Sequence, residues 1–214
     1  MNVEHICFDL DGTLVQSSKT IYKATLKTLL ELNIATGLPE DKFNEMIGLH
    51  FIDIFNELKI TVPDFEEFIG IYKEVYFDFI EDSNLYPFVE ETLSLLKEKN
   101  NTKVSLLTTK SQDQADRIVR YFHLHRYFDF VMGRREGIAH KPSAEPLLFV
   151  CEQLNVKSKS SMIVGDTELD ILCGKNSGAI TCGVTYGYRT KENLKGYDPD
   201  YLLDSLDKFN SILE

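Results

Sequence analysis

From residue 87 onward, short apolar runs alternate with amphipathic segments, and this alternation limits the fold more than any other feature of the chain. The apolar runs predict strands at residues 103–108, 128–132, 161–164 and 180–184. The segments between them have apolar side chains at helical spacing and predict helices at 87–99, 111–122, 145–154 and 167–176, with a last helix at 204–213. Such alternation favours parallel strands joined by crossover helices. We therefore predict an α/β fold, a Rossmann-like doubly wound parallel sheet.

A long helical segment interrupts this pattern after the first strand. Residues 3–8 predict a short buried strand, and the next strand does not begin until residue 103. Between them, a helix is expected at 17–34, and Asp64 followed by Glu67 has the spacing of a capping box that opens another. We predict a catalytic core made of residues 1–14 and 85–214, with residues 15–84 inserted as a separate α-helical cap.

The first strand ends in Asp9-Leu10-Asp11-Gly12, which places two carboxylates two residues apart. In extended backbone, residues i and i+2 point the same way. One carboxylate can therefore act as a nucleophile while the other moves protons, with a metal held between them. Taken alone, the same residues fit an Asx-type turn at the end of a strand.

Further polar residues follow the other predicted strands. Thr108 and Thr109 end the second strand, Lys141 lies in the loop after the third, and Asp166 ends the fourth. Ligands of doubly wound sheets bind beyond the carboxyl ends of the strands, so these side chains are expected to converge with Asp9. Taken singly, Lys141 fits a solvated loop lysine and Thr108 fits a cap at the end of a strand.

The converging carboxylates predict a metal site. Asp9, Asp11 and Asp166 would repel one another and retain protons unless a cation neutralised them. Hard oxygen donors without cysteine or well-spaced histidine favour Mg²⁺. Lys141 could steady the nucleophile, and Thr108 could donate to a phosphoryl oxygen. Asp170 fits both a capping role in the helix that Thr167 opens and a place behind the metal, next to its water ligands.

Composition limits the partners. The formal charge is −11, from 23 Lys and Arg against 34 Asp and Glu, and the basic residues are scattered. This pattern disfavours nucleic acid and membrane surfaces, and it requires local groups to hold an anionic substrate. No secretory signal or stretch of about 18 apolar residues stands out, so we expect a cytoplasmic protein. The four cysteines lack metal-site spacing and are expected to be buried reduced thiols: Cys7, Cys151, Cys173 and Cys182.

Four segments, in this order, resemble the motifs of the haloacid dehalogenase-like hydrolases: Phe8-Asp9-Leu10-Asp11-Gly12-Thr13-Leu14, Leu107-Thr108-Thr109-Lys110, Lys141-Pro142 and Val164-Gly165-Asp166-Thr167-Glu168-Leu169-Asp170. The likeness spans nearly the whole chain, and the helical insertion is similar to that family's helical cap. The phosphoglycolate phosphatase-like branch is the most similar, with support from residues 46–49 and 185–188. Gln16 and Thr109 depart from that branch, which often has an acidic residue and an asparagine at these positions.

The resemblance implies a role for each matching residue. Asp9 would attack phosphorus and form an aspartyl-phosphate, and Asp11 would protonate the leaving alcohol and then activate water. The Asp9 carboxylate, the Asp11 backbone carbonyl and Asp166 would hold Mg²⁺. The residues expected to bind the phosphoryl group or the substrate are Gly12, Thr108, Thr109, Lys110 and Lys141.

The resulting prediction is a phosphatase that hydrolyses a small phosphomonoester, such as phosphoglycolate. An aspartate at position 11 favours a phosphatase or mutase over the family's dehalogenases and ion pumps. A sugar phosphomutase and a catalytically idle scaffold are the alternatives, and sugar phosphates, nucleotides and pyrophosphate stay open as substrates. Contacts to the leaving group are expected from residues 47–50 and Arg134, in a monomer or homodimer.

Overall fold

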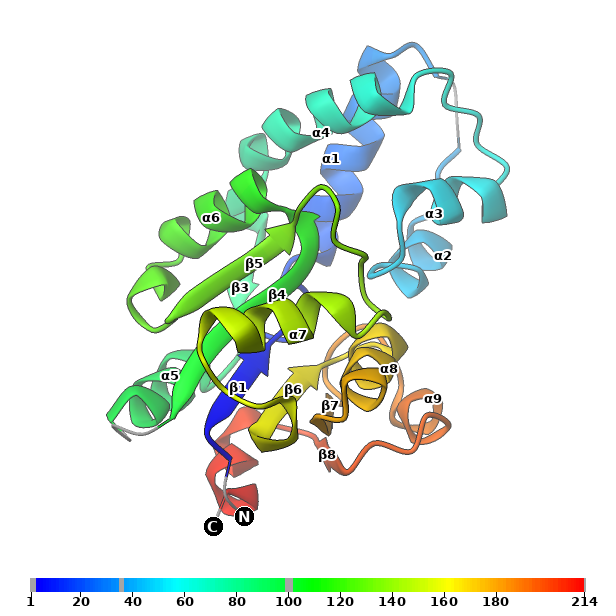
Figure 1. Ribbon diagram of the computed structural model, residues 1–214. Helices are drawn as coiled ribbons and strands as arrows, with labels where there is room; N and C mark the ends of the chain where they lie inside the picture. The colour runs from blue at the N-terminus through cyan, green and yellow to red at the C-terminus, as the bar shows by residue number, and fades with distance from the viewer. Residues whose placement is uncertain (1–2, 35–36, 99–101, 214) are drawn as a thin grey trace. The chain divides into compact units, whose positions relative to one another are not determined.

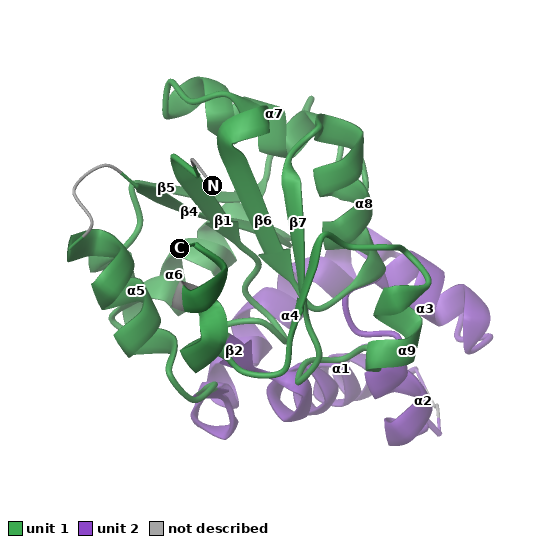
Figure 2. Cartoon of the chain, turned by 90° about the horizontal axis from the view of Figure 1, so that it is seen from below, with its two compact units in different colours: residues 1–14, 85–214 green, residues 15–84 purple. Residues whose placement is uncertain are grey.

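The chain divides into two compact units in the computed structural model, which describes residues 3–34, 37–98 and 102–213 (Figure 2). Met1–Leu14 and Leu85–Glu214 form the core unit, and Val15–Asn84 form the inserted unit. The chain thus leaves the core unit once, after its first strand, and returns to it once.

Six parallel strands form the sheet of the core unit (Figure 1). Their order across the sheet is β5-β4-β1-β6-β7-β8. Their bounds are β1 His5–Phe8, β4 Lys103–Ser111, β5 Phe130–Arg134, β6 Ser161–Gly165, β7 Ile180–Val184 and β8 Tyr201–Leu203. The predicted α/β class with a doubly wound parallel sheet is therefore confirmed.

Helices cover both faces of this sheet (Figures 1 and 2). The step from β4 to β5 runs towards one edge and the step from β5 to β6 runs back, so right-handed crossovers put their helices on opposite faces. One face carries α5, α6 and η4, and the other carries α7 and α8. The bounds are α5 Val89–Glu98, α6 Gln112–Tyr121, α7 Glu145–Gln153, α8 Glu168–Ser177 and η4 Leu206–Ile212.

Alternate side chains of the central strands fill the two layers of the core. Cys7 belongs to a buried cluster with Leu147 and Val150 of α7 and Cys173 of α8. Phe8 points the other way, and its ring centroid lies 5.5 Å from that of Phe209 in η4. The four cysteines are free and buried, as predicted.

The C-terminal part of the core unit differs from the prediction. The expected last helix at residues 204–213 is a 3-10 helix, η4, over Leu206–Ile212. The strand β8 was not predicted at all, because three residues between polar turns carry no periodic signal. Strand β4 runs to Ser111, beyond the predicted end at residue 108, so Thr108 to Lys110 are strand residues. Lys99, the predicted end of the preceding helix, lies outside the described residues.

The inserted unit is helical, as its apolar spacing indicates. Its helices are α1 Ser18–Glu31, α2 Glu40–Glu45, α3 Phe51–Glu57, α4 Phe65–Asp78 and η1 Ile80–Asp82. The Asp64 carboxylate accepts the backbone N–H of Glu67 at 2.9 Å and caps α4, as predicted. Phe68 packs against Phe55 and Phe51, with ring centroids 5.0 and 5.2 Å apart, so this unit has an aromatic core of its own.

The two ends of the insertion are adjacent. Short strands β2 (Val15–Gln16) and β3 (Asn84–Leu85) form a two-stranded sheet where the chain passes between the units. The backbone N–H of Tyr86 also donates to the Leu14 carbonyl at 3.0 Å. The two ends of the insertion are therefore paired with each other.

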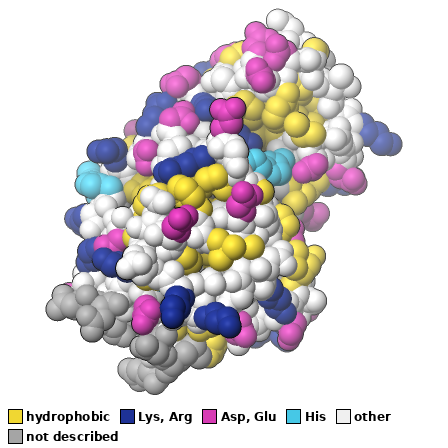
Figure 3. Space-filling view, in the orientation of Figure 1, with side chains coloured by type: hydrophobic (Ala, Val, Ile, Leu, Met, Phe, Trp, Pro, Cys, Tyr) yellow, Lys and Arg dark blue, Asp and Glu magenta, His cyan; other side chains and the backbone are white. Residues whose placement is uncertain are grey.

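On the face shown in Figure 3, Lys and Arg side chains are scattered among Asp and Glu. No helix within the described ranges is long and apolar enough to cross a membrane.

Candidate active site

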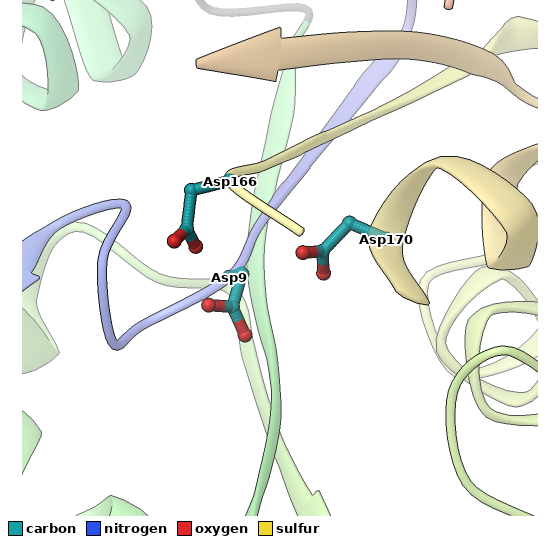
Figure 4. A group of neighbouring side chains, drawn as sticks. All are labelled: Asp9, Asp166 and Asp170. Atoms are coloured by element: carbon teal, nitrogen blue, oxygen red, sulfur yellow. The ribbon is translucent and has the colours of Figure 1, made fainter. Parts of the chain in front are cut away.

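Three carboxylates gather at the carboxyl end of the central strands (Figure 4). Asp9 follows β1, Asp166 follows β6 and Asp170 lies in the first turn of α8. Each contributes a ligand oxygen, and these oxygens all lie within 4.8 Å of one another. The backbone N–H of Asp9 donates to the Val164 carbonyl at 2.9 Å, so β1 and β6 stay paired up to the site.

Asp166 is held by two donors that come from different loops. The hydroxyl of Thr13 donates to Oδ1 at 3.1 Å, and the backbone N–H of Tyr188 donates to Oδ2 at 2.7 Å. The chain can approach this closely because the loops carry glycine: a Cβ at Gly12 or Gly187 would collide with the Asp166 side chain. Gly12 also has a φ of +84°, which favours glycine. Asp166 is therefore enclosed by backbone on two sides.

Lys141 connects two of the three carboxylates. Its Nζ donates to Asp9 Oδ1 at 2.6 Å, to Asp170 Oδ1 at 2.5 Å and to the Leu107 carbonyl at 3.2 Å. The side chain is buried. The interpretation of Lys141 as a solvated loop lysine is therefore wrong, because burial with two carboxylate partners fixes its position.

Asp170 contacts both Thr167 and Lys141. Its Oδ2 accepts the backbone N–H of Thr167 at 3.1 Å and the Thr167 hydroxyl at 2.7 Å. The capping role at the start of α8 is thus confirmed. The Oδ1 contact with Lys141 makes Asp170 a positioning residue for that lysine, and a role towards a metal-bound water stays a prediction.

Electrostatics in this cluster follow from burial. Burial raises the pKa of Asp9 and of Asp166 above the usual range, with Lys141 opposing the rise at Asp9. Burial alone would lower the pKa of Lys141, but the Asp170 and Asp9 carboxylates outweigh it and raise that pKa. One lysine ammonium therefore faces three buried carboxylates, which leaves the cluster short of positive charge.

The donor set fits a divalent cation. Asp9, Asp166 and Asp170 are hard oxygen donors, and among the described residues they form the group able to hold a metal. Asp170 already binds Lys141 and Thr167, so Asp9 and Asp166 are the better placed carboxylates. Because burial disfavours charge on these two side chains, a cation between them would relieve that cost.

The other predicted residues lie in the core unit beside this cluster. The carboxylate of Asp11 lies 3.4 Å from Lys110 Nζ. Thr108 is buried, and its hydroxyl accepts the backbone N–H of Lys110 at 3.3 Å. Thr108, Thr109, Lys141 and Arg134 line one pocket. Lys110 thus neighbours the predicted acid–base group, and its binding of phosphate stays a prediction.

Residues 47–50, expected to contact the leaving group, belong to the inserted unit. Ile47 and Leu49 form an isolated bridge there, and His50 precedes α3. Their predicted role stays a prediction.

Sequence reasoning missed the backbone donor of Tyr188 and the role of Gly187. The loop after β7 carries both, and the Tyr186 hydroxyl anchors it by donating to the Thr13 carbonyl at 2.9 Å. The rule that ligands bind beyond the carboxyl ends of strands applies to β7 as well, so it could have included this loop. It could not have identified a backbone N–H as the contacting group.

Comparisons with known proteins agree with this geometry. The model of the family described as haloacid dehalogenase-like hydrolase matches residues 6–184. The pyrophosphatase PpaX of Bacillus mycoides (strain KBAB4) is 31% identical over 217 residues, covering 100% of this chain and 98% of the relative.

Two solved structures have the same fold. A haloacid dehalogenase-like family hydrolase of Streptococcus pneumoniae superposes with a TM-score of 0.87 at 24% identity, covering 100% of this chain and 99% of that one. A protein of Haemophilus somnus 129PT, described as a predicted phosphoglycolate phosphatase, gives a TM-score of 0.85 at 24% identity over the same shares. The chain therefore belongs to the haloacid dehalogenase-like hydrolases, and within them to the phosphatases.

Proposed function

We propose that the protein is a Mg²⁺-dependent phosphatase that hydrolyses a small phosphorylated metabolite through an aspartyl-phosphate on Asp9. The observation that carries the proposal is the buried cluster in which Lys141 contacts Asp9 at 2.6 Å while Asp166 lies close by. A lysine fixed on one oxygen of a carboxylate orients the whole group, which is what a nucleophile needs.

In the first step, an Asp9 oxygen attacks phosphorus, and the bond between phosphorus and the leaving oxygen breaks. Asp11 gives its proton to that oxygen, so the leaving group departs as an alcohol. In the second step, Asp11 takes a proton from water, and the hydroxyl attacks the phosphorus of the aspartyl-phosphate. Phosphate leaves, and the Asp9 carboxylate is restored.

The surrounding residues favour both steps by holding charge in place. Thr108 would donate to a phosphoryl oxygen, and Lys141 would keep Asp9 oriented and offset the charge that develops on the transferring group. Mg²⁺ held by Asp9, Asp166 and the Asp11 carbonyl would neutralise the carboxylates and withdraw charge from the phosphoryl oxygens.

The inserted unit is proposed to act as the cap that selects the leaving group. The Bacillus mycoides relative is named a pyrophosphatase, and the Haemophilus somnus neighbour is described as a predicted phosphoglycolate phosphatase. Pyrophosphate and phosphoglycolate are therefore the first two substrates to compare, together with sugar phosphates and nucleotides.

Phosphate release with Mg²⁺ across this panel tests the proposal, with wild type beside Asp9→Asn. We expect turnover by wild type and a loss of at least about 10³-fold in Asp9→Asn, because an amide cannot form the covalent intermediate. Asp207→Asn, a change at an exposed carboxylate in η4, is the matched control and should keep full activity. Thermal unfolding of each variant establishes that the fold survives.

Activity that persists in Asp9→Asn would overturn the covalent mechanism. Turnover that requires an added sugar bisphosphate would indicate a phosphomutase. No turnover with or without that activator would favour the idle scaffold.

A further inference from the structure

The predicted phosphate-binding residues share a pocket with two arginines. All of the residues that line this pocket belong to the core unit. Its charged and titratable lining consists of Arg134, Arg135, His140 and Lys141, and no acidic side chain of the described residues lines it. Because Lys141 already contacts the Asp9 and Asp170 carboxylates, the two arginines supply the positive charge that this pocket offers to a ligand.

The two arginines differ in what holds them. Arg135 is anchored: its Nε donates to Gln112 Oε1 at 3.2 Å, and its guanidinium lies 5.3 Å from the Phe130 ring centroid and 5.5 Å from that of Phe149. Arg134 is partly buried, and burial alone lowers its pKa. Within the described ranges, no carboxylate compensates the charge of Arg134. A partly desolvated arginine without a protein anion costs stability unless a ligand supplies the anion.

The backbone that carries Arg134 is firmly held. Arg134 is the last residue of β5 and pairs with Ser111 of β4. The neighbouring Gly133 donates its N–H to Gln112 Oε1 at 2.9 Å, and the Gln112 amide donates to the Val131 carbonyl at 3.2 Å. The backbone of Arg134 is thus fixed at a strand end, so only its side chain must be ordered when the guanidinium binds.

We propose that Arg134 binds a second anionic group of the substrate, a carboxylate or a second phosphate attached close to the phosphoryl group that is transferred. This proposal rests on the proposed phosphatase function and adds the substrate class to it. Thr108 and Lys141 line the same pocket as Arg134, so one small molecule in the pocket can contact all three side chains. Because Arg134 and the predicted phosphate-binding side chains line one pocket, the second anion must lie close to the transferred phosphoryl group, as it does in a compact dianionic metabolite.

A pair of matched substrates isolates the second anion. The pair is 2-phosphoglycolate and 2-hydroxyethyl phosphate, which differ by a carboxylate in place of a hydroxymethyl group, and pyrophosphate represents a second phosphate. We expect Arg134→Gln to lower kcat/KM for 2-phosphoglycolate or pyrophosphate by about 10- to 100-fold, the loss typical of one hydrogen bond to a charged group. The kcat/KM for 2-hydroxyethyl phosphate should stay nearly unchanged.

Two further variants control for charge. Arg134→Lys keeps the positive charge and should restore part of the lost preference for the dianionic substrate. Arg120→Gln removes an exposed charge from α6 and should leave kcat/KM for both substrates unchanged. Comparing each variant with wild type on each substrate cancels the difference in leaving-group pKa between the two esters.

Binding measured without turnover separates this proposal from the proposed function. Calorimetry with pyrophosphate and with 2-phosphoglycolate compares Asp9→Asn with the double variant Asp9→Asn/Arg134→Gln, and the double variant should bind at least one of them about tenfold more weakly or worse. Equal affinities would overturn the role of Arg134 even if wild type is an active phosphatase. A wild type that prefers 2-hydroxyethyl phosphate, or an Arg134→Gln variant that loses activity equally on both esters, would also overturn it.

Discussion

At the scale of single residues, the site depends on how closely backbone approaches Asp166. Gly12 and Gly187 leave no room for a side chain, and the Tyr188 N–H meets the carboxylate from the same loop as Gly187. A carboxylate that backbone groups hold in place would lose little conformational freedom on binding the proposed metal. The two glycines therefore matter for the orientation of Asp166 although they carry no chemistry.

Replacing Gly187 with alanine tests this dependence. The added Cβ would collide with Asp166 and with the Gly12 carbonyl, so the loop must shift and the Tyr188 hydrogen bond must weaken. We expect the affinity for Mg²⁺, measured by calorimetry, to fall by about 10- to 100-fold, as is typical when the groups that orient a metal ligand are disturbed.

Gly70→Ala is the matched control, because Gly70 lies inside α4 and a Cβ there meets nothing within 4 Å. That change should leave Mg²⁺ affinity unaltered and stabilise the protein by about 0.5–1 kcal/mol. Unchanged affinity in Gly187→Ala would mean that Asp166 does not need this loop.

At the scale of elements, the sequence predicted the strands and helices that are long enough to show a clear apolar pattern, and it failed for elements too short to show one. Strands β1, β6 and β7 were predictable because they are continuous apolar runs, whereas β8 is too short to show a pattern. The clustering of Asp9 with Asp166 was predictable because parallel strands end at one edge. The Lys141–Asp170 contact was not, since it joins a loop to a helix whose relative positions only the folded chain defines.

A buried polar network joins three strands at the other end of the sheet. His5 of β1 lies between two hydroxyls, with Nδ1 2.9 Å from Ser161 Oγ of β6 and Nε2 2.7 Å from Ser105 Oγ of β4. Burial lowers the pKa of His5 to about 4, and Asp129 opposes this only in part. The neutral imidazole therefore holds β1 to both of its neighbours.

This network predicts a loss of stability in mild acid. Because the folded-state pKa of His5 is below its ordinary value of 6.5, the unfolded chain binds a proton first as pH falls. Stability from this group is fully present above pH 6.5 and is lost between pH 6.5 and 4. We expect His5 to account for about 2 kcal/mol of the decrease in unfolding free energy between pH 7 and pH 5.

Chemical denaturation of wild type and His5→Asn at these two pH values measures the effect. The variant should be less stable at pH 7, and it should lose less stability than wild type on going to pH 5. An equal pH dependence in both proteins would show that His5 does not titrate in the folding equilibrium.

At the scale of the whole molecule, the chain forms two units that are joined where the ends of the insertion meet. The hydrogen bond from the Tyr86 N–H to the Leu14 carbonyl joins the two segments of the core unit at this point. The candidate chemistry lies entirely in the core unit, from Asp9 to Tyr188, and the inserted unit has a separate aromatic core. The sequence predicted that this segment is helical and separate, but spacing alone could not identify which of its residues contact a substrate.

Deleting the insertion tests whether the core unit is self-sufficient. A variant in which a short Gly/Ser linker replaces residues 15–84 should fold, because Leu14 and Tyr86 already meet and a short loop costs little closure entropy. We expect a cooperative thermal transition, retained Mg²⁺ binding and reduced discrimination among phosphate esters. A deletion variant without a cooperative transition would mean that the core needs the inserted unit to fold.

The ammonium group of Lys141 carries three hydrogens. The folded chain already supplies three acceptors for them, on Asp9, Asp170 and Leu107. In the proposed mechanism, a phosphoryl oxygen that binds Lys141 would replace or share one of these acceptors, so the contact would add little to the hydrogen bonds that Lys141 already makes. Lys141 would then contribute little to the affinity for the bound ester or for inorganic phosphate, and its contribution would fall on the charge that develops during transfer.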